Sequence, residues 1–114
     1  MCYIDITMQL KTVLFFKTEK KEPVLEWIES LDNSSRSRIF VRLERLKAGN
    51  YGDHKRFKGI VELRFHFGQG YRIYIGEDGK NIVILLAGGD KSTQHKDIYK
   101  ALTNWEAYND KNKI

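Results

Sequence analysis

The chain has 114 residues, of which 41% are hydrophobic and 31% charged, and these values are typical of a soluble globular protein with one domain. The formal net charge of +5 favours an acidic or polyanionic partner, although a soluble protein with a basic surface would show the same charge. Cys2 is the only cysteine, which excludes an intrachain disulfide and argues against a cysteine-based metal site. The sequence lacks the pattern of a signal peptide and any apolar run near the roughly 18 residues of a membrane span. We therefore expect a cytoplasmic protein.

The first half of the chain is predicted to form a strand and then two helices. Residues 9–17 are β-branched and aromatic, as in a strand. Pro23 suits the first turn of a helix, and a second helix is expected over residues 35–48, with Gly49 placed to end it. Apolar residues recur at helical spacing in both segments, as Val24, Ile28 and Leu31 in the first and Ile39, Leu43 and Leu46 in the second.

The second half changes to the alternation of strands. From Ile60 to Phe67 apolar and polar residues alternate, and the pattern resumes from Tyr71 to Ile75 after a glycine-bearing turn. An Asp-Gly turn within residues 77–80 leads into residues 81–87, which are apolar on both faces and are expected in the interior of the sheet. A last helix is expected over residues 94–108. The predicted fold class is α+β, with a helical hairpin packed on a small, mostly antiparallel sheet.

The hairpin between the two alternating segments brings basic residues together. If residues 68–70 form its turn, His66 pairs with Arg72 and Arg64 pairs with Tyr74, so that all four side chains share one face. The next hairpin returns the segment before Lys91 to the same end of the sheet.

Clustered cations of this kind favour an anion, and phosphate is the obvious candidate. Tyr74 and nearby aromatic rings could stack on a nucleic acid base. An ordinary polar network, in which Glu62 and Asp90 pair with the arginines, accounts for the same pattern equally well.

Several segments together resemble a known family. "LERLKAGNYGD", "GIVELRFHFG", "GYRIYI" and "GGDKSTQHKDIYKA" resemble the RelE/ParE superfamily of bacterial toxins, and within it the HigB-like branch of addiction-module killer proteins. The resemblance covers roughly residues 9–105, so residues 1–8 would be an N-terminal extension of a single RelE-like domain, residues 1–114. It implies two helices packed on a small antiparallel sheet.

The resemblance implies the toxin of a type II toxin–antitoxin system. Many members of the superfamily cleave mRNA in the ribosomal A site, by attack of the substrate's own 2′-OH on the adjacent phosphate, without a metal or another cofactor. The implied partners are mRNA, the ribosome and a cognate helix-turn-helix antitoxin, with operator DNA bound only through the antitoxin. We expect no membrane association.

The resemblance also suggests roles for particular residues. Arg72 falls where RNA-cleaving members carry an essential arginine, Arg64 and Lys91 fall at further basic positions, and His95 lies near the position of a tyrosine or histidine. His66 competes with His95 for the role in proton transfer, because histidine changes its charge near neutral pH. The candidates for contact with nucleic acid are Lys55, Arg56, Lys58, His66 and Tyr74.

Other interpretations remain open at this point. A ParE-like toxin would block DNA gyrase without cutting RNA, although such members generally lack the full set of basic and acid–base residues. A toxin-derived module could serve only to bind its partner. Arg38, Arg42 and Arg45 form a further stripe on the second helix, which we expect to be solvated or ion-paired, or else to contact an acidic antitoxin or ribosomal RNA.

Overall fold

The computed structural model describes residues 10–112. The expected N-terminal extension, residues 1–8, lies outside the described residues, and so do Gln9 and the chain end from residue 113. Within the described part the elements follow in the order β1 (Thr12–Phe15), α1 (Pro23–Glu29), α2 (Asn33–Lys47), β2 (His54–Phe57), β3 (Ile60–Arg64), β4 (Arg72–Asp78), β5 (Ile82–Gly89), a 3-10 turn η1 (Lys91–Thr93) and α3 (Gln94–Lys111).

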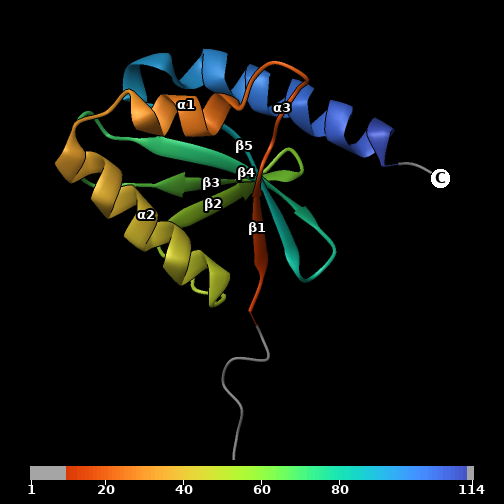
Figure 1. The fold of residues 1–114 in the computed structure, drawn as a ribbon, viewed down its shortest axis with the longest axis horizontal. Coiled ribbons are helices and arrows are strands. Elements are labelled where there is room, and N and C mark those ends of the chain that lie inside the picture. The colour runs from red at the N-terminus through yellow and green to blue at the C-terminus, as the bar shows by residue number, and fades with distance from the viewer. Residues whose placement is uncertain (1–9, 113–114) are drawn as a thin grey trace, which may run out of the picture.

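The five strands form one mixed sheet in the order β1-β5-β4-β3-β2 (Figure 1). β1 pairs with β5 in parallel, whereas the other neighbours are antiparallel. The α+β class, the mostly antiparallel sheet and the C-terminal helix are thus confirmed. β5 is an interior strand, as its apolar sequence predicts.

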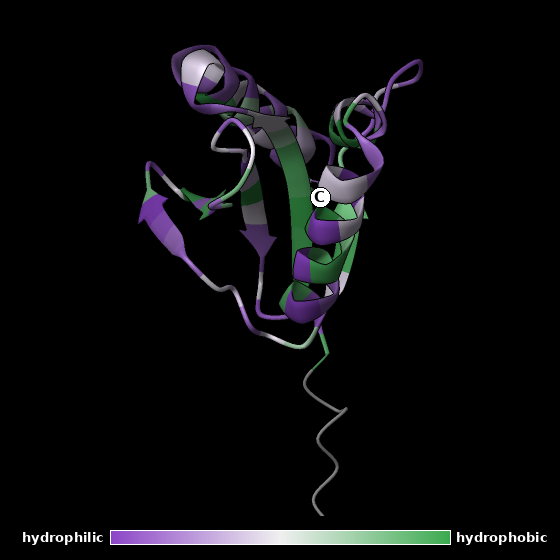
Figure 2. Ribbon diagram, turned by 90° about the vertical axis from the view of Figure 1, so that its left-hand side faces the viewer, coloured by the Kyte–Doolittle hydropathy of each residue, from purple (hydrophilic) through white to green (hydrophobic). Residues whose placement is uncertain are grey.

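Helices cover both faces of the sheet. Val24 and Ile28 of α1, with the apolar stripe of α2, pack on one face against alternate residues of β3, β4 and β5. Ala101 of α3 packs on the other face, against Tyr74 and Ile84. The interior strands are accordingly the hydrophobic part of the molecule (Figure 2).

Local sequence explains where the helices begin and how closely they approach the sheet. Pro23 begins α1, and the Asp32 side chain caps α2 by accepting a hydrogen bond of 3.2 Å from the Ser35 amide. Gly88 of β5 lies directly under the Trp27 ring, where a Cβ atom would collide with the indole. The missing side chain therefore lets α1 lie close against β5.

The register of the β3–β4 hairpin differs from the prediction by two residues. Arg72 lies opposite Arg64, not His66, and Tyr74 lies opposite Glu62, not Arg64. The Phe65 amide still donates to the Tyr71 carbonyl, at 2.9 Å, so the connecting loop comprises residues 66–70 and is longer than the turn predicted. A shift of two residues keeps every side chain on its predicted face. His66 and Phe67, which the alternation placed in the strand, lie in this loop.

β2 is a strand that the sequence pattern did not predict. Its residues, "HKRF", lack apolar alternation, and the sequence pattern placed no strand there. They pair with β3 at the edge of the sheet, where one strand face and one backbone edge are solvated. Charged residues are common on such edges because they discourage pairing with other chains.

Across residues 10–112, none of the helices has both the length and the apolar character that crossing a membrane requires.

Candidate functional site

A basic cleft lies where β3 ends, β4 begins and the chain leaves β5. It has a volume of about 280 Å³ and is lined by Arg64, Phe65, His66, Phe67, Gly68, Gly70, Arg72 and Lys91. Four residues that the sequence singled out are therefore brought together: Arg64, His66, Arg72 and Lys91. The pairing of Arg72 with Gly89 explains why Lys91, two residues farther on, reaches the same end of the sheet.

A buried carboxylate contacts both arginines of this cleft. Glu62 is 2% exposed, and its Oε1 accepts a hydrogen bond of 2.9 Å from Nε of Arg64. Its Oε2 accepts from Nε2 of Gln94 at 3.0 Å and lies 3.6 Å from Nε of Arg72. One carboxylate therefore positions the two arginines, which face each other across the β3–β4 pair.

The charge on Glu62 is maintained by these contacts. Burial by itself would raise the pKa of the Glu62 carboxyl, but hydrogen bonds from Arg64 and Gln94 outweigh burial and lower that pKa. Glu62 is consequently ionised at neutral pH. Two guanidinium groups share this single negative charge, so positive charge remains in excess on the cleft side.

Arg72 is the more enclosed of the two arginines. Its side chain is 16% exposed, against 34% for Arg64. Its Nη1 donates to the Gly70 carbonyl at 2.8 Å, whereas its buried Nε has no hydrogen-bond partner among the described residues. Gly70 has φ of +74°, a left-handed conformation that glycine adopts at little cost. The loop thereby fixes one end of the guanidinium, while its Nε lies toward Glu62.

The pairing of the arginines with acidic residues is thus partly observed. Glu62 does pair with both arginines, but Asp90 accepts hydrogen bonds from Ser92 and caps η1. These bonds lower the pKa of the Asp90 carboxyl. The cap fixes the start of η1 and the position of Lys91, whose amide donates to the Gln69 carbonyl at 3.4 Å.

His66 lies on the rim of the cleft. Its side chain is 77% exposed, and Nε2 lies 2.5 Å from Oδ2 of Asp53. This hydrogen bond is the main cause of the lowered pKa of the Asp53 carboxyl. His66 is therefore an exposed imidazole with an oriented carboxylate behind it, beside the arginines.

Other predicted residues lie elsewhere. His95 is exposed in the first turn of α3 and is not among the residues lining the cleft. Tyr74 is fully buried, so its ring cannot stack on a base, and our expectation for it is wrong. Burial and the neighbouring Glu62 carboxylate raise its pKa.

The basic run before the sheet also stays outside the cleft. Lys55 and Arg56 belong to β2, and Lys58 lies in the β2–β3 turn, with all three exposed. Arg56 is ion-paired with Glu77, so its charge is already neutralised. Lys55 lies opposite Glu62 and thus on the sheet face that carries Arg64.

Sequence reasoning missed three features of the site. Gln94 was not singled out, although it lies in the quoted segment "GGDKSTQHKDIYKA". Asp53 was also missed, because nothing in the pattern joins it to His66. Glu62 was considered only as part of an ordinary network. Across residues 10–112 there is no group of three or more His, Cys, Asp or Glu side chains that could hold a metal ion.

The fold and the cleft define a small α+β protein whose cationic side chains converge at one end of its sheet. The chain belongs to the family of phage-derived Gp49-like proteins, whose family model matches residues 26–106. This is a toxin-like family related to addiction modules. The matched range contains every residue that lines the basic cleft.

A bacterial relative extends the comparison. An uncharacterized protein of Haemophilus influenzae is 45% identical over 98 residues, which is 84% of this chain and 91% of that protein. No solved structure matched the chain.

Proposed function

We propose that this protein is a RelE-like toxin of a type II toxin–antitoxin system, and that it cleaves mRNA on the ribosome. One observation carries the proposal: two arginines, oriented by a buried carboxylate, share a cleft with a lysine and an exposed histidine. The family of the chain and its resemblance to RelE-type toxins supply the biological setting.

The proposed reaction requires charge stabilisation and two proton transfers. The 2′ oxygen of one nucleotide attacks the adjacent phosphorus, and the bond from phosphorus to the 5′ oxygen breaks. The 2′ hydroxyl loses its proton and the leaving 5′ oxygen gains one. The products are a 2′,3′-cyclic phosphate and a 5′ hydroxyl. Negative charge increases on the phosphoryl oxygens in the transition state, and preorganised cations stabilise it there.

Arg72 is the first candidate for this stabilisation, because it is the more enclosed arginine and is fixed by both Gly70 and Glu62. Arg64 and Lys91 add positive charge from either side of the cleft. Such donors act strongly when they are already oriented before the reaction begins.

The proton-transfer residue is proposed to be His66. Among the two histidines considered, His66 lines the cleft, and Asp53 orients its ring. His95 would have to approach the substrate from the start of α3, and it stays as the alternative. Imidazole suits this role because it can accept and donate protons near neutral pH.

The proposed partners follow from the same assignment. A cognate helix-turn-helix antitoxin would neutralise the toxin, and operator DNA would be bound only through that antitoxin. Messenger RNA in the ribosome would be the substrate.

Primer extension on mRNA from cells that briefly express the protein tests this function, with Arg72→Ala expressed in parallel. We expect new 5′ ends within translated frames, which are absent with Arg72→Ala and present with Lys20→Ala, a change in the exposed β1–α1 loop. Growth arrest without new ends would overturn the nuclease and favour gyrase inhibition. Circular dichroism of both variants checks that they fold.

A further inference from the structure

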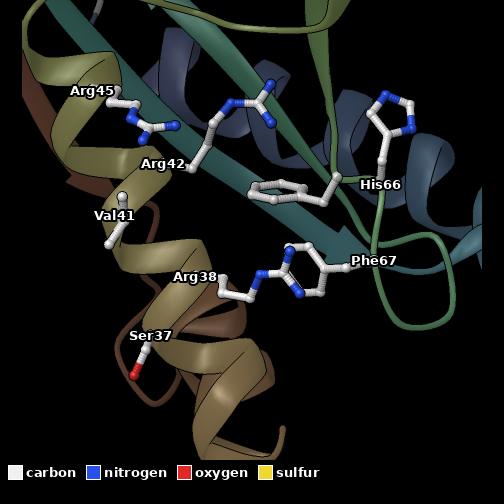
Figure 3. Close-up of a pocket in the computed structure, with 8 residues that line it drawn as sticks. Ser37, Arg38, Val41, Arg42, Arg45, His66 and Phe67 are labelled. Carbon is white, nitrogen blue, oxygen red and sulfur yellow. The ribbon is translucent and has the colours of Figure 1, made fainter.

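A second hollow, the arginine groove, lies between α2 and the loop after β3. It has a volume of about 390 Å³ and is lined by Ser37, Arg38, Val41, Arg42, Arg45, Phe65, His66 and Phe67. Figure 3 shows the α2 side chains along one wall and His66 and Phe67 on the other. None of the residues that line it is acidic.

The arginines that line this groove differ in their contacts. Arg42 is committed to the fold, because its guanidinium donates to the carbonyls of Tyr51, Asp53 and Arg64 at 2.6–3.1 Å. Arg38 and Arg45 are exposed on the same helix wall. Their charges therefore face a groove whose lining offers no carboxylate.

The wall formed by the loop after β3 carries an aromatic ring, that of Phe67. The Arg38 guanidinium lies over the Phe67 ring, 4.2 Å from its centroid. Phe67 is half-buried and is held edge-on by Phe65 and Tyr71, with ring centroids 6.0 and 5.6 Å away. When Arg38 moves from this ring to a phosphate, it exposes a fixed aromatic face of the kind on which single-stranded bases stack.

The arginine groove and the basic cleft adjoin each other. Phe65, His66 and Phe67 line both hollows, so this segment forms the ridge between them. A strand whose phosphate lies at Arg72 could therefore cross the ridge and reach Arg38. Asp53, the carboxylate beside the ridge, is already hydrogen-bonded to His66.

We propose that the arginine groove binds single-stranded RNA that flanks the cleavage position, with Arg38 and Arg45 at backbone phosphates and Phe67 under a base. This inference rests on the proposed function and adds the path of the substrate strand. RNA accounts for the groove better than a protein partner does, because the groove adjoins the cleft proposed for phosphate and arginines form one of its walls.

Fluorescence anisotropy with the full chain tests the path. The probes are single-stranded oligonucleotides of about 4 and about 12 nucleotides, made with 2′-deoxyribose throughout so that they cannot be cleaved by 2′-OH attack. The Arg38→Ala/Arg45→Ala variant is compared with wild type and with Lys20→Ala/Lys21→Ala, which removes the same charge from the exposed β1–α1 loop. Thermal melts establish that all of them fold.

We expect the groove variant to bind the long probe at least about tenfold more weakly, while the short probe, which fits the cleft, is unaffected. The dependence of log affinity on log salt should become shallower by about 1.4, since each lost phosphate contact on a single strand contributes about 0.7. The control should keep the steeper dependence, and Arg38→Lys/Arg45→Lys should restore most of it.

Equal long-probe affinity in the groove variant and wild type would overturn the path while leaving the nuclease intact, provided that wild type still generates new mRNA 5′ ends. Wild type that neither binds the probes nor generates such ends would overturn the proposed function itself. A groove variant that keeps its RNA affinity but escapes neutralisation by the co-expressed antitoxin would make the groove a protein interface, and the path would again be wrong.

Discussion

The two groups of arginines on either side of the ridge are built in opposite ways. Arg64 and Arg72 project from neighbouring strands and share the buried carboxylate of Glu62. Arg38 and Arg45 project from α2 into a groove lined without an acidic residue. The sheet pair is thus partly neutralised and fixed, whereas the helix pair is exposed and retains its charge.

The two arginine groups suit different electrostatic roles. A cation that is oriented in advance can stabilise charge at one place, because little reorganisation is needed during the reaction. An exposed arginine on a long side chain adapts to many positions of a phosphate, and its effect is screened by salt. We therefore assign chemistry to the sheet pair and guidance of the strand to the helix pair.

Replacing Arg72 should have the largest effect. Arg72→Ala removes the enclosed guanidinium, and we expect cleavage to fall about 10²- to 10³-fold, as on loss of one preorganised donor. The measurement is the rate at which new mRNA 5′ ends form at matched protein levels. Arg72→Lys is the matched control, because it keeps the charge but loses the contacts of the guanidinium with Gly70 and Glu62. Its cleavage rate should lie between those of wild type and Arg72→Ala. A rate for Arg72→Lys equal to that of wild type would show that charge alone matters.

His66 lies on the ridge between the two groups, so its replacement tests which side it serves. His66→Asn should lower cleavage about 10²-fold, the usual contribution of general acid–base catalysis, and leave RNA affinity nearly unchanged. His95→Asn is the matched control, because both histidines are exposed and neither change should disturb folding. If His95→Asn is instead the inactive variant, proton transfer occurs from the start of α3 and our placement is wrong.

The alternation of the sequence was sufficient to predict the faces of this site but not its register. Arg64 and Arg72 share a face whether their strands pair as predicted or two residues away, because side chains alternate with a period of two. The pattern therefore could not reveal that His66 leaves the strand. Aromatic contacts among Phe65, Phe67 and Tyr71, which join the loop to the strand ends, favour the longer loop.

Two further features depend on contacts that no local pattern encodes. Arg42 has the same spacing as Arg38 and Arg45, yet it alone binds backbone carbonyls, since residues 51–53 pass beside it. The edge strand β2 has no apolar alternation, because it gains its stability from pairing with β3. The hairpin turn within residues 77–80, in contrast, correctly placed Lys91 near Arg72.

Glu62→Gln tests whether the shared carboxylate is what distinguishes the sheet pair. The change keeps the shape but leaves two guanidinium groups without their buried counter-charge, so we expect a loss of about 2–3 kcal/mol in the free energy of unfolding. Cleavage should fall about tenfold, since the arginines lose their orientation. Denaturant unfolding measures the first effect, and Glu44→Gln, at an exposed site on α2, is the control.

The same carboxylate predicts a pH dependence. Because the folded state lowers the pKa of Glu62, its stabilising contribution is fully present above about pH 4.5, the unfolded value, and is lost as pH falls through the lower folded value. Unfolding curves recorded from neutral pH into this acid range should therefore fall more steeply for wild type than for Glu62→Gln. Parallel curves would mean that Glu62 is not charged in the folded protein.

The smallest effects are expected at β2. Its two adjacent cations, Arg56 and Lys55, differ as the two arginine groups do, because one is paired with a carboxylate and the other is exposed. Arg56 is ion-paired with Glu77 and lies over the Tyr51 ring, whereas Lys55 is exposed on the sheet face that carries Arg64. Lys55→Ala should weaken binding of the long oligonucleotide a few-fold and reduce its salt dependence by about 0.7. Arg56→Ala should leave RNA affinity unchanged and alter stability by no more than about 1 kcal/mol, as for other exposed ion pairs. Equal losses of RNA affinity in Lys55→Ala and Arg56→Ala would show that an ion-paired cation contributes to RNA binding as much as an exposed one. The distinction between paired and exposed cations would then not hold for β2.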